Sequence, residues 1–132
     1  MISYSITKTI SIDAPVRKVF DFLANLENWQ DWAIATIEKI QLYDGEWWEA
    51  ATPVGSALLR LRPNATFGTL DHDFDADDAS WTVPARVVPN GTGSEVMITL
   101  MQPRGTSLAD FEEQLALVGG ELEHLKRLME TT

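Results

Sequence analysis

The chain has 132 residues, 45% of them hydrophobic, which suits one domain with one core. Ten Lys and Arg stand against 20 Asp and Glu, and the resulting net charge of −10 disfavours nucleic acid and anionic membranes as partners. Without cysteine there are no disulfides, thiolate metal ligands or cysteine nucleophiles. Neither a membrane span nor a signal peptide is recognisable, so we expect one cytoplasmic domain over 1–132 with no membrane insertion.

The first elements are a strand and two short helices. Apolar and polar residues alternate over 4–12, which predicts a half-buried strand whose apolar face is interrupted by Lys8. Asp13 and Pro15 are typical of a helix start. A stripe of apolar residues then predicts a helix, and residues 26–33 indicate a second, shorter one; the stripe is Val16, Val19, Phe20 and Leu23.

Turn-forming residues then divide the chain into short segments with strand character. Gly, Pro, Asn and Asp recur at the intervals expected of an antiparallel meander. With the first strand, the sequence therefore predicts seven strands, the six further ones being about 36–43, 46–52, 56–62, 66–74, 79–88 and 93–102.

A long amphipathic helix closes the chain. Ser107 is placed to cap its start, with Asp110 three residues later. Gly119 and Gly120 fall in its middle, where we expect either a bend or a close backbone approach. Its apolar residues recur in steps of three and four: Leu108, Phe111, Leu115, Val118, Leu122, Leu125 and Met129.

Residues 10–29 resemble the N-terminal signature of the START-like, or SRPBCC, superfamily, which includes polyketide cyclase/dehydrase-like and birch-allergen-like proteins. The segment 121–130 is similar to the closing helix of that superfamily. The resemblance implies an α+β helix-grip fold, in which a seven-stranded curved antiparallel sheet wraps around the long C-terminal helix. It also implies a cavity between sheet and helix for an apolar or amphipathic small molecule. No catalytic motif of a characterised member matches residue by residue.

The alternation of the strands and the helix stripe predict which side chains line this cavity. In 56–62 and 66–74 the apolar face alternates with charged residues, and 79–88 follows the same pattern. The predicted ligand-binding residues are Trp32, Leu59, Leu61, Leu70, His72, Phe74, Trp81, Val83, Phe111, Leu115, Val118 and Leu122.

Three ionisable residues fall among apolar neighbours, namely Lys8, Glu38 and His72. An imidazole has a pKa suited to proton transfer near neutral pH, and a carboxyl group in an apolar wall has a raised pKa. His72 and Glu38 are therefore the candidate catalytic residues. The alternative is structural: a core histidine satisfied by a carbonyl or carboxylate, and a glutamate at a strand end with its head in water.

The segment 71–78 contains five aspartates, but its spacing departs from that of a calcium loop, so no metal site is expected. The chain also lacks a glycine-rich phosphate loop, and we expect no cofactor. Arg60, Arg62 and Arg86 are assigned to the outer face, paired with acids. The acidic segment would border the cavity and favour neutral or cationic ligands.

The leading functional hypothesis is the binding of a hydrophobic or aromatic small molecule. A second is an enzyme of the cyclase, dehydratase or isomerase type, with His72 as acid or base and Glu38 or Glu49 as its partner. A third is an interaction module like the chaperone-ATPase activators, which would dock through Trp47 or Trp48. An exposed tryptophan in this pair would also suit a homodimer contact.

Overall fold

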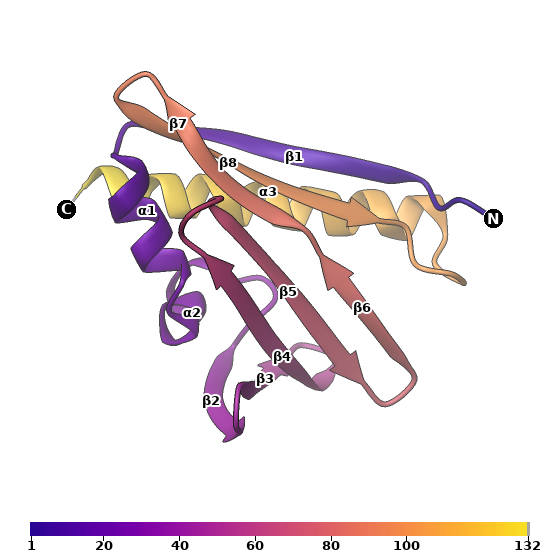
Figure 1. Ribbon diagram of the computed structural model, residues 1–132. Helices are drawn as coiled ribbons and strands as arrows, with labels where there is room; N and C mark the ends of the chain where they lie inside the picture. The colour runs from indigo at the N-terminus through magenta and orange to yellow at the C-terminus, as the bar shows by residue number, and fades with distance from the viewer. Residues whose placement is uncertain (132) are drawn as a thin grey trace.

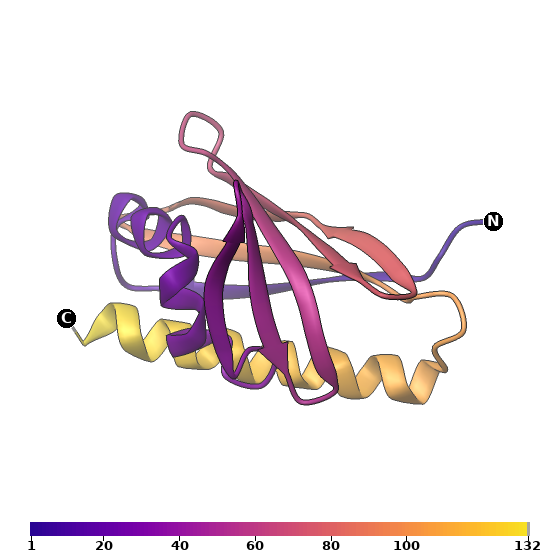
Figure 2. The ribbon, with the colours of Figure 1, turned by 90° about the horizontal axis from the view of Figure 1, so that it is seen from below.

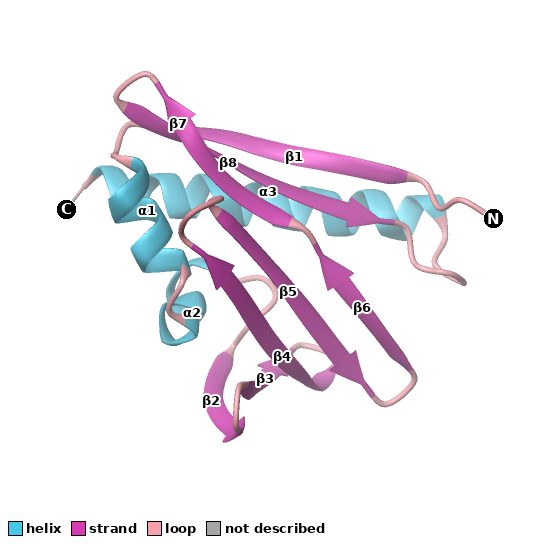
Figure 3. Cartoon of the chain, in the orientation of Figure 1, coloured by secondary structure: helices cyan, strands magenta, loops and turns pink. Residues whose placement is uncertain are grey.

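The computed structural model describes residues 1–131, so Thr132 of the expected domain lies outside it. Strand β1 (Ser5–Ile12) leads into helix α1 (Val16–Leu23), a short 3-10 turn η1 (Leu26–Asn28) and the single-turn helix α2 (Trp29–Trp32). The chain ends in the long helix α3 (Leu108–Glu130), as Figures 1 and 3 show. Between α2 and α3 lie β2 (Lys39–Asp44), β3 (Trp47–Thr52), β4 (Gly55–Asn64), β5 (Thr69–Ala76), β6 (Ala79–Val83), β7 (Ala85–Asn90) and β8 (Gly93–Met101).

The strands form one antiparallel sheet in the order β1-β8-β7-β5-β4-β3-β2, with β6 paired to β5 beside this path. The sheet curves, and α3 runs along its concave side, where it packs mainly against β1 (Figure 2). This is the α+β helix-grip architecture that the sequence predicted, including the short helices after the first strand.

The predicted strand 79–88 is in fact two strands, because Pro84 interrupts it. Proline has no N–H to donate to a neighbouring strand, although the Pro84 carbonyl still accepts a hydrogen bond from Thr99 N at 2.9 Å. Before Pro84, β6 pairs with β5, and after it, β7 pairs with β8. The sheet therefore divides at this point, and β6 diverges from β8 (Figure 1).

The strand register confirms the predicted inward faces. Leu61 lies opposite His72, which lies opposite Val83. One row further along, Leu59 lies opposite Phe74. These residues face α3, while the residues that alternate with them face outward on the convex side.

Helices α1 and α3 begin in different ways at their N-caps. Ser107 caps α3 as predicted, because its hydroxyl accepts a hydrogen bond from Asp110 N at 3.1 Å. Asp13 does not cap α1. The N-cap position is held by Pro15, and the Asp13 amide instead donates to the Glu130 carboxylate at 2.8 Å.

The main core lies beneath α1 and α2 and against the C-terminal half of α3, where Leu122, Leu125 and Met129 are buried. Phe111 and Leu115, in the first half of α3, are buried apart from this cluster, and Phe111 packs edge-on against Tyr4. In the described part of the chain, none of the helices combines the length and the apolar composition needed to cross a membrane.

Candidate functional site

The predicted ligand-binding residues divide by their access to solvent. Phe74 and Val118 are half-buried and Trp81 is 46% exposed. The other nine are buried: Trp32, Leu59, Leu61, Leu70, His72, Val83, Phe111, Leu115 and Leu122. Only the first three can therefore be reached by a molecule from outside without movement of the core.

The enclosed space inside the core is very small. A cavity of about 10 Å³ lies beneath α1 and α2, which is room for about one water molecule. Ligand pockets usually measure roughly 300–1,000 Å³. This cavity cannot hold the small molecule expected from the sequence. It is lined by Leu23, Trp29, Trp32, Leu70, His72, Ala85, Arg86, Val96 and Ile98.

The concave side is open near the β5–β6 hairpin. Trp81 lies opposite Phe74 and shares its inward face, yet its side chain is almost half exposed. The two rings stack, with centroids 5.1 Å apart and an angle of 18° between their planes. They form an apolar surface at the place where β6 has left β8.

Helix α3 presents open space to the same side of the sheet. Gly119 is four residues after Leu115 and three before Leu122, so it belongs to the buried stripe of the helix. A Cβ atom built on Gly119 would meet nothing within 4 Å. The close approach considered for this glycine pair is therefore wrong, and the helix leaves room here.

Lys8 is the one charged residue on the inward face of β1. It lies opposite Ile98 and shares the face of the buried Ile12. Its side chain is half-buried, and within residues 1–131 its ammonium group has no hydrogen-bond or ion-pair partner. The nitrogen itself remains accessible to solvent. We call Lys8, Phe74, Trp81, Val118 and Gly119 together the open concave face.

His72 lies deep in the wall behind this face. It is 5% exposed, and its Nδ1 lies 3.0 Å from the Leu70 carbonyl oxygen. Because a carbonyl only accepts, Nδ1 carries the proton of the neutral ring. The Trp29 ring meets the imidazole edge-on at 4.8 Å. Burial lowers the His72 pKa from 6.5 to about 4, against the opposing effect of the Leu70 hydrogen bond, so the ring is neutral at pH 7.

For Glu38, the other candidate catalytic residue, the structural alternative holds, because it lies at a strand end in solvent. It precedes β2 and is exposed, although the next inward residue, Ile40, is buried. Its backbone N–H donates to the Ala51 carbonyl at 2.8 Å. The structure does not bring Glu38 and His72 together. The same holds for Glu49, which faces the convex side opposite Leu58.

The tryptophan pair at 47 and 48 is split between the two faces, and both side chains are half-buried. Trp48 packs inward against the core, while the Arg60 guanidinium lies 4.6 Å above the ring of Trp47 on the outside. Trp29 and Trp32 belong to the core. Neither residue of the pair is the fully exposed anchor that a docking module would need.

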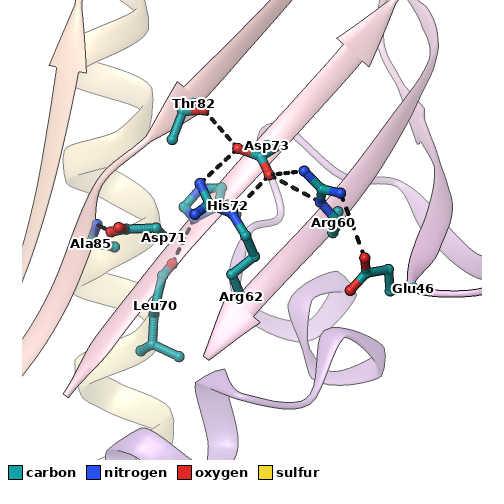
Figure 4. Close-up of polar contacts among 9 residues, drawn as sticks. All are labelled: Glu46, Arg60, Arg62, Leu70, Asp71, His72, Asp73, Thr82 and Ala85. Carbon is teal, nitrogen blue, oxygen red and sulfur yellow. Dashed lines mark hydrogen bonds and ion pairs between the residues drawn. The ribbon is translucent and has the colours of Figure 1, made fainter. Parts of the chain in front are cut away.

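A network of charged side chains covers the convex face around Asp73 (Figure 4). Its carboxylate accepts hydrogen bonds from Arg60 and Arg62 at 2.9 Å and from the Thr82 hydroxyl at 2.6 Å. These donors, the Arg62 hydrogen bond above all, hold the Asp73 pKa well below its usual value. Arg60 and Arg62 thus pair with an acid on the convex face, as predicted, whereas Arg86 donates to the Phe67 carbonyl at 3.2 Å.

The acidic segment is divided between the convex face and the β5–β6 turn. Asp71 and Asp75 face outward with Asp73, where they accept hydrogen bonds from Ala85 N and the Ser80 hydroxyl. Asp77 and Asp78 lie in the turn between β5 and β6. Among residues 1–131, no group of three or more His, Asp or Glu side chains is arranged to hold a metal ion.

One buried acid was not predicted from the sequence. Glu121, on α3, is 4% exposed and accepts hydrogen bonds from Ala35 N at 3.1 Å and Thr36 N at 2.9 Å. Burial raises its pKa, and the hydrogen bonds from Thr36 and Ala35 oppose that effect. It ties the loop after α2 to α3. In the sequence, the only indication of its burial is its position next to the apolar Leu122.

A surface hollow of about 400 Å³ lies at the other end of the molecule, open to solvent. It is lined by the end of β1, the β7–β8 turn and Lys126 of α3. Lys126 is engaged there with the Ser11 carbonyl and with Glu130. The hollow is polar and separate from the residues predicted to bind a ligand.

No protein-family model matches the chain, and no curated protein matches its sequence. Solved structures do resemble it. An uncharacterised protein from Bacillus thuringiensis has a TM-score of 0.78 at 15% identity, covering 96% of this chain and 98% of that one. Ara h 8.0201, a birch-allergen-like protein, has a TM-score of 0.76 at 9% identity, with 98% and 99% covered. The Aha1 dimer from Colwellia psychrerythraea has 0.76 at 14%, with 97% of each chain covered. At these identities the likeness establishes the helix-grip fold that these proteins share.

Proposed function

We propose that this protein binds a small apolar or amphipathic molecule on the open concave face, between the β5–β6 hairpin and the first half of α3. The observation that carries the proposal is the exposure of Trp81. Its ring faces inward and stacks on Phe74, but almost half of its surface is left uncovered. Apolar rings on an inward face are normally buried, so an uncovered one favours an absent occupant.

The space at Gly119 supports the same proposal. Binding must offset at least about 4 kcal/mol of lost translational and rotational freedom, and apolar burial returns about 25 cal/mol per Å². A ligand must therefore bury about 160 Å² of apolar surface or more. It would gain that area by contacting Trp81 and Phe74 on one side and α3 at Val118 and Gly119 on the other.

An acid–base enzyme is less well supported. His72 is sealed behind the wall and neutral, its Nδ1 is engaged with Leu70, and Glu38 lies elsewhere on the surface. A general acid or base must come within hydrogen-bond distance of the substrate. The binding function makes no such demand on these two residues.

Two neighbouring glycines provide a matched test. Gly119→Leu would place a side chain in the open space of the inward stripe, whereas Gly120→Leu would point to solvent. The probe is N-phenyl-1-naphthylamine, a neutral aromatic amine whose fluorescence rises in apolar surroundings. We expect saturable binding to the wild-type protein, at least tenfold weaker binding to Gly119→Leu, and unchanged binding to Gly120→Leu.

Trp81→Ala, which removes the exposed ring, should also weaken binding of the probe. Thermal unfolding of each variant verifies that the fold is kept. If the probe fails to saturate the wild-type protein, or binds both leucine variants equally, the proposed site is wrong.

We further propose that the chain forms a homodimer through the edge strand β2. Leu42 and Tyr43 on this strand are 60% and 62% exposed, and β2 ends the sheet with one edge unpaired among the described strands. Sedimentation velocity should then show a concentration-dependent dimer. Tyr43→Lys should convert it to a monomer, and a wild-type protein that stays monomeric at high concentration would refute the proposal.

A further inference from the structure

Lys8 distinguishes the open concave face from a purely apolar surface. The strands contain five basic residues, and four of them, Lys39, Arg60, Arg62 and Arg86, face the convex side by register. Lys8 alone faces α3. No acidic residue of the described strands shares its face. Glu49, Glu95 and the aspartates of β5 alternate outward, and Asp44 lies opposite the outward Trp47 after a bulge in β2. The inward face of a chain of net charge −10 thus carries one positive charge with no partner.

The packing of β1 along α3 places Lys8 at the level of Gly119. Tyr4 contacts Phe111 near one end of the pair, and Lys126 reaches the Ser11 carbonyl near the other. Lys8 lies four residues after Tyr4, or about 13 Å along an extended chain. The same distance along a helix, at about 1.5 Å per residue, leads from Phe111 to about position 120. Lys8 and the open space in α3 therefore lie at the same level along the β1–α3 pair.

We propose that Lys8 binds the carboxylate of an amphipathic ligand whose apolar body extends over Gly119 and Val118 towards Phe74 and Trp81. This inference rests on the proposed function and assigns its ligand class. The ammonium group is accessible to solvent and has no counter-ion among residues 1–131, and a charge-assisted hydrogen bond to a carboxylate is among the stronger polar contacts available to it.

The surroundings favour a carboxylate over other head groups. A single lysine matches one negative charge, whereas phosphate recognition usually employs several cations or the guanidinium forks of arginine. The arginines of the sheet are on the other face, where Arg60 and Arg62 are paired with Asp73 and Arg86 with the Phe67 carbonyl. The aspartates of β5 face away from Lys8, so they do not oppose the binding of a carboxylate there.

The test compares decanoate with decanol, which share an apolar chain and differ in head group, by isothermal titration calorimetry at pH 7.5. Lys8→Met removes the charge and keeps an apolar stem that suits this face. Lys39→Met makes the same change in net charge on the convex side of β2 and is the matched control. We expect decanoate to bind Lys8→Met at least tenfold more weakly than the wild-type protein, with decanol affinity unchanged within about twofold. Lys39→Met should behave as the wild type, and Lys8→Arg should retain decanoate binding.

The outcomes separate this inference from the proposed function. If decanol and decanoate bind the wild-type protein equally well, or Lys8→Met keeps its affinity for decanoate, the role of Lys8 is refuted while the apolar site survives. If neither compound binds, both proposals fail. Decyl phosphate serves as a third ligand, and tighter binding of it than of decanoate would refute the assignment of a carboxylate.

Discussion

A single buried imidazole makes the stability of this protein depend on pH. The His72 pKa is about 4 in the folded protein and near 6.5 in the unfolded chain, because burial disfavours the charged ring. Between these values the unfolded state holds a proton that the native state lacks, so stability is lost as pH falls from 6.5 towards 4. From about pH 7.5 to pH 5 the free energy of unfolding should decrease by about 2 kcal/mol through His72 alone.

His72→Asn isolates this contribution. An asparagine amide can still donate to the Leu70 carbonyl but does not titrate in this range, so the variant should lose about 2 kcal/mol less than the wild-type protein over the same interval. Urea unfolding at several pH values measures both curves. Parallel curves would mean that His72 does not remain neutral in the fold.

The buried carboxylate of Glu121 is expected to hold the loop after α2 in place. Glu121→Ala leaves the Ala35 amide without its acceptor and the Thr36 amide with only the Ala33 carbonyl at 3.1 Å, so it should cost about 1–3 kcal/mol of unfolding free energy. Glu123→Ala, two positions along the same helix and exposed, is the matched control and should change stability little.

Amide hydrogen exchange at Ala35 and Thr36 separates a local from a general effect. In Glu121→Ala the exchange rate of these two amides should increase more than that of other amides in the chain. In Glu123→Ala both amides should stay protected. Equal protection in both variants would show that the loop is held by other contacts.

At the scale of elements, the helix glycines should be destabilising in themselves. A Cβ at Gly119 or Gly120 meets no atom within 4 Å, and each glycine costs a helix about 1 kcal/mol relative to alanine. Gly119→Ala and Gly120→Ala should therefore each raise the unfolding free energy by about 1 kcal/mol. Gly68→Ala provides the contrast, because Gly68 has φ +70° and a Cβ there would collide with the Val87 carbonyl oxygen. That variant should be destabilised by more than about 1 kcal/mol.

Chemical denaturation of the three alanine variants tests the comparison. A loss of stability at both helix positions would mean that the bend or contact expected from the sequence exists in solution. If Gly119→Ala is stable but binds the naphthylamine probe more weakly than Gly120→Ala, the helix retains this glycine for its ligand and not for its fold.

The strands were predictable where alternation is strict and less so where a single residue changes the pairing. In β4 and β5 the inward residues alternate with Arg and Asp, so their faces could be assigned from the sequence. Pro84 was read as an interior residue of one strand, although its missing N–H makes it a natural break. That break lets β6 leave β8, and with it comes the exposure of Trp81, which alternation alone could not foresee.

For the whole molecule, the order of elements together with the START-like resemblance predicted the helix-grip fold, but not how its interior is filled. Whether a core closes depends on the summed volumes of side chains from distant segments, and Trp29, Trp32 and His72 together leave only about 10 Å³. Lys8 was visible in the sequence as an interruption of an apolar face. Its lack of a partner depends on the register of every neighbouring strand, which a local pattern cannot supply.

The net charge of −10 sets the last expectation, which concerns salt. The ion pairs found within residues 1–131 are mostly exposed and individually weak, so repulsion among the surplus acids should oppose the compact state. Salt shortens the range of that repulsion from about 30 Å at 0.01 M to about 10 Å at 0.1 M. The melting temperature should therefore rise by a few degrees when sodium chloride is increased over this interval at pH 7. Asp77→Lys, in the exposed β5–β6 turn, should melt higher than the wild-type protein at low salt and respond less to added salt. A melting temperature that falls with salt would instead mean that ion pairs such as Arg60 with Glu46 outweigh the repulsion.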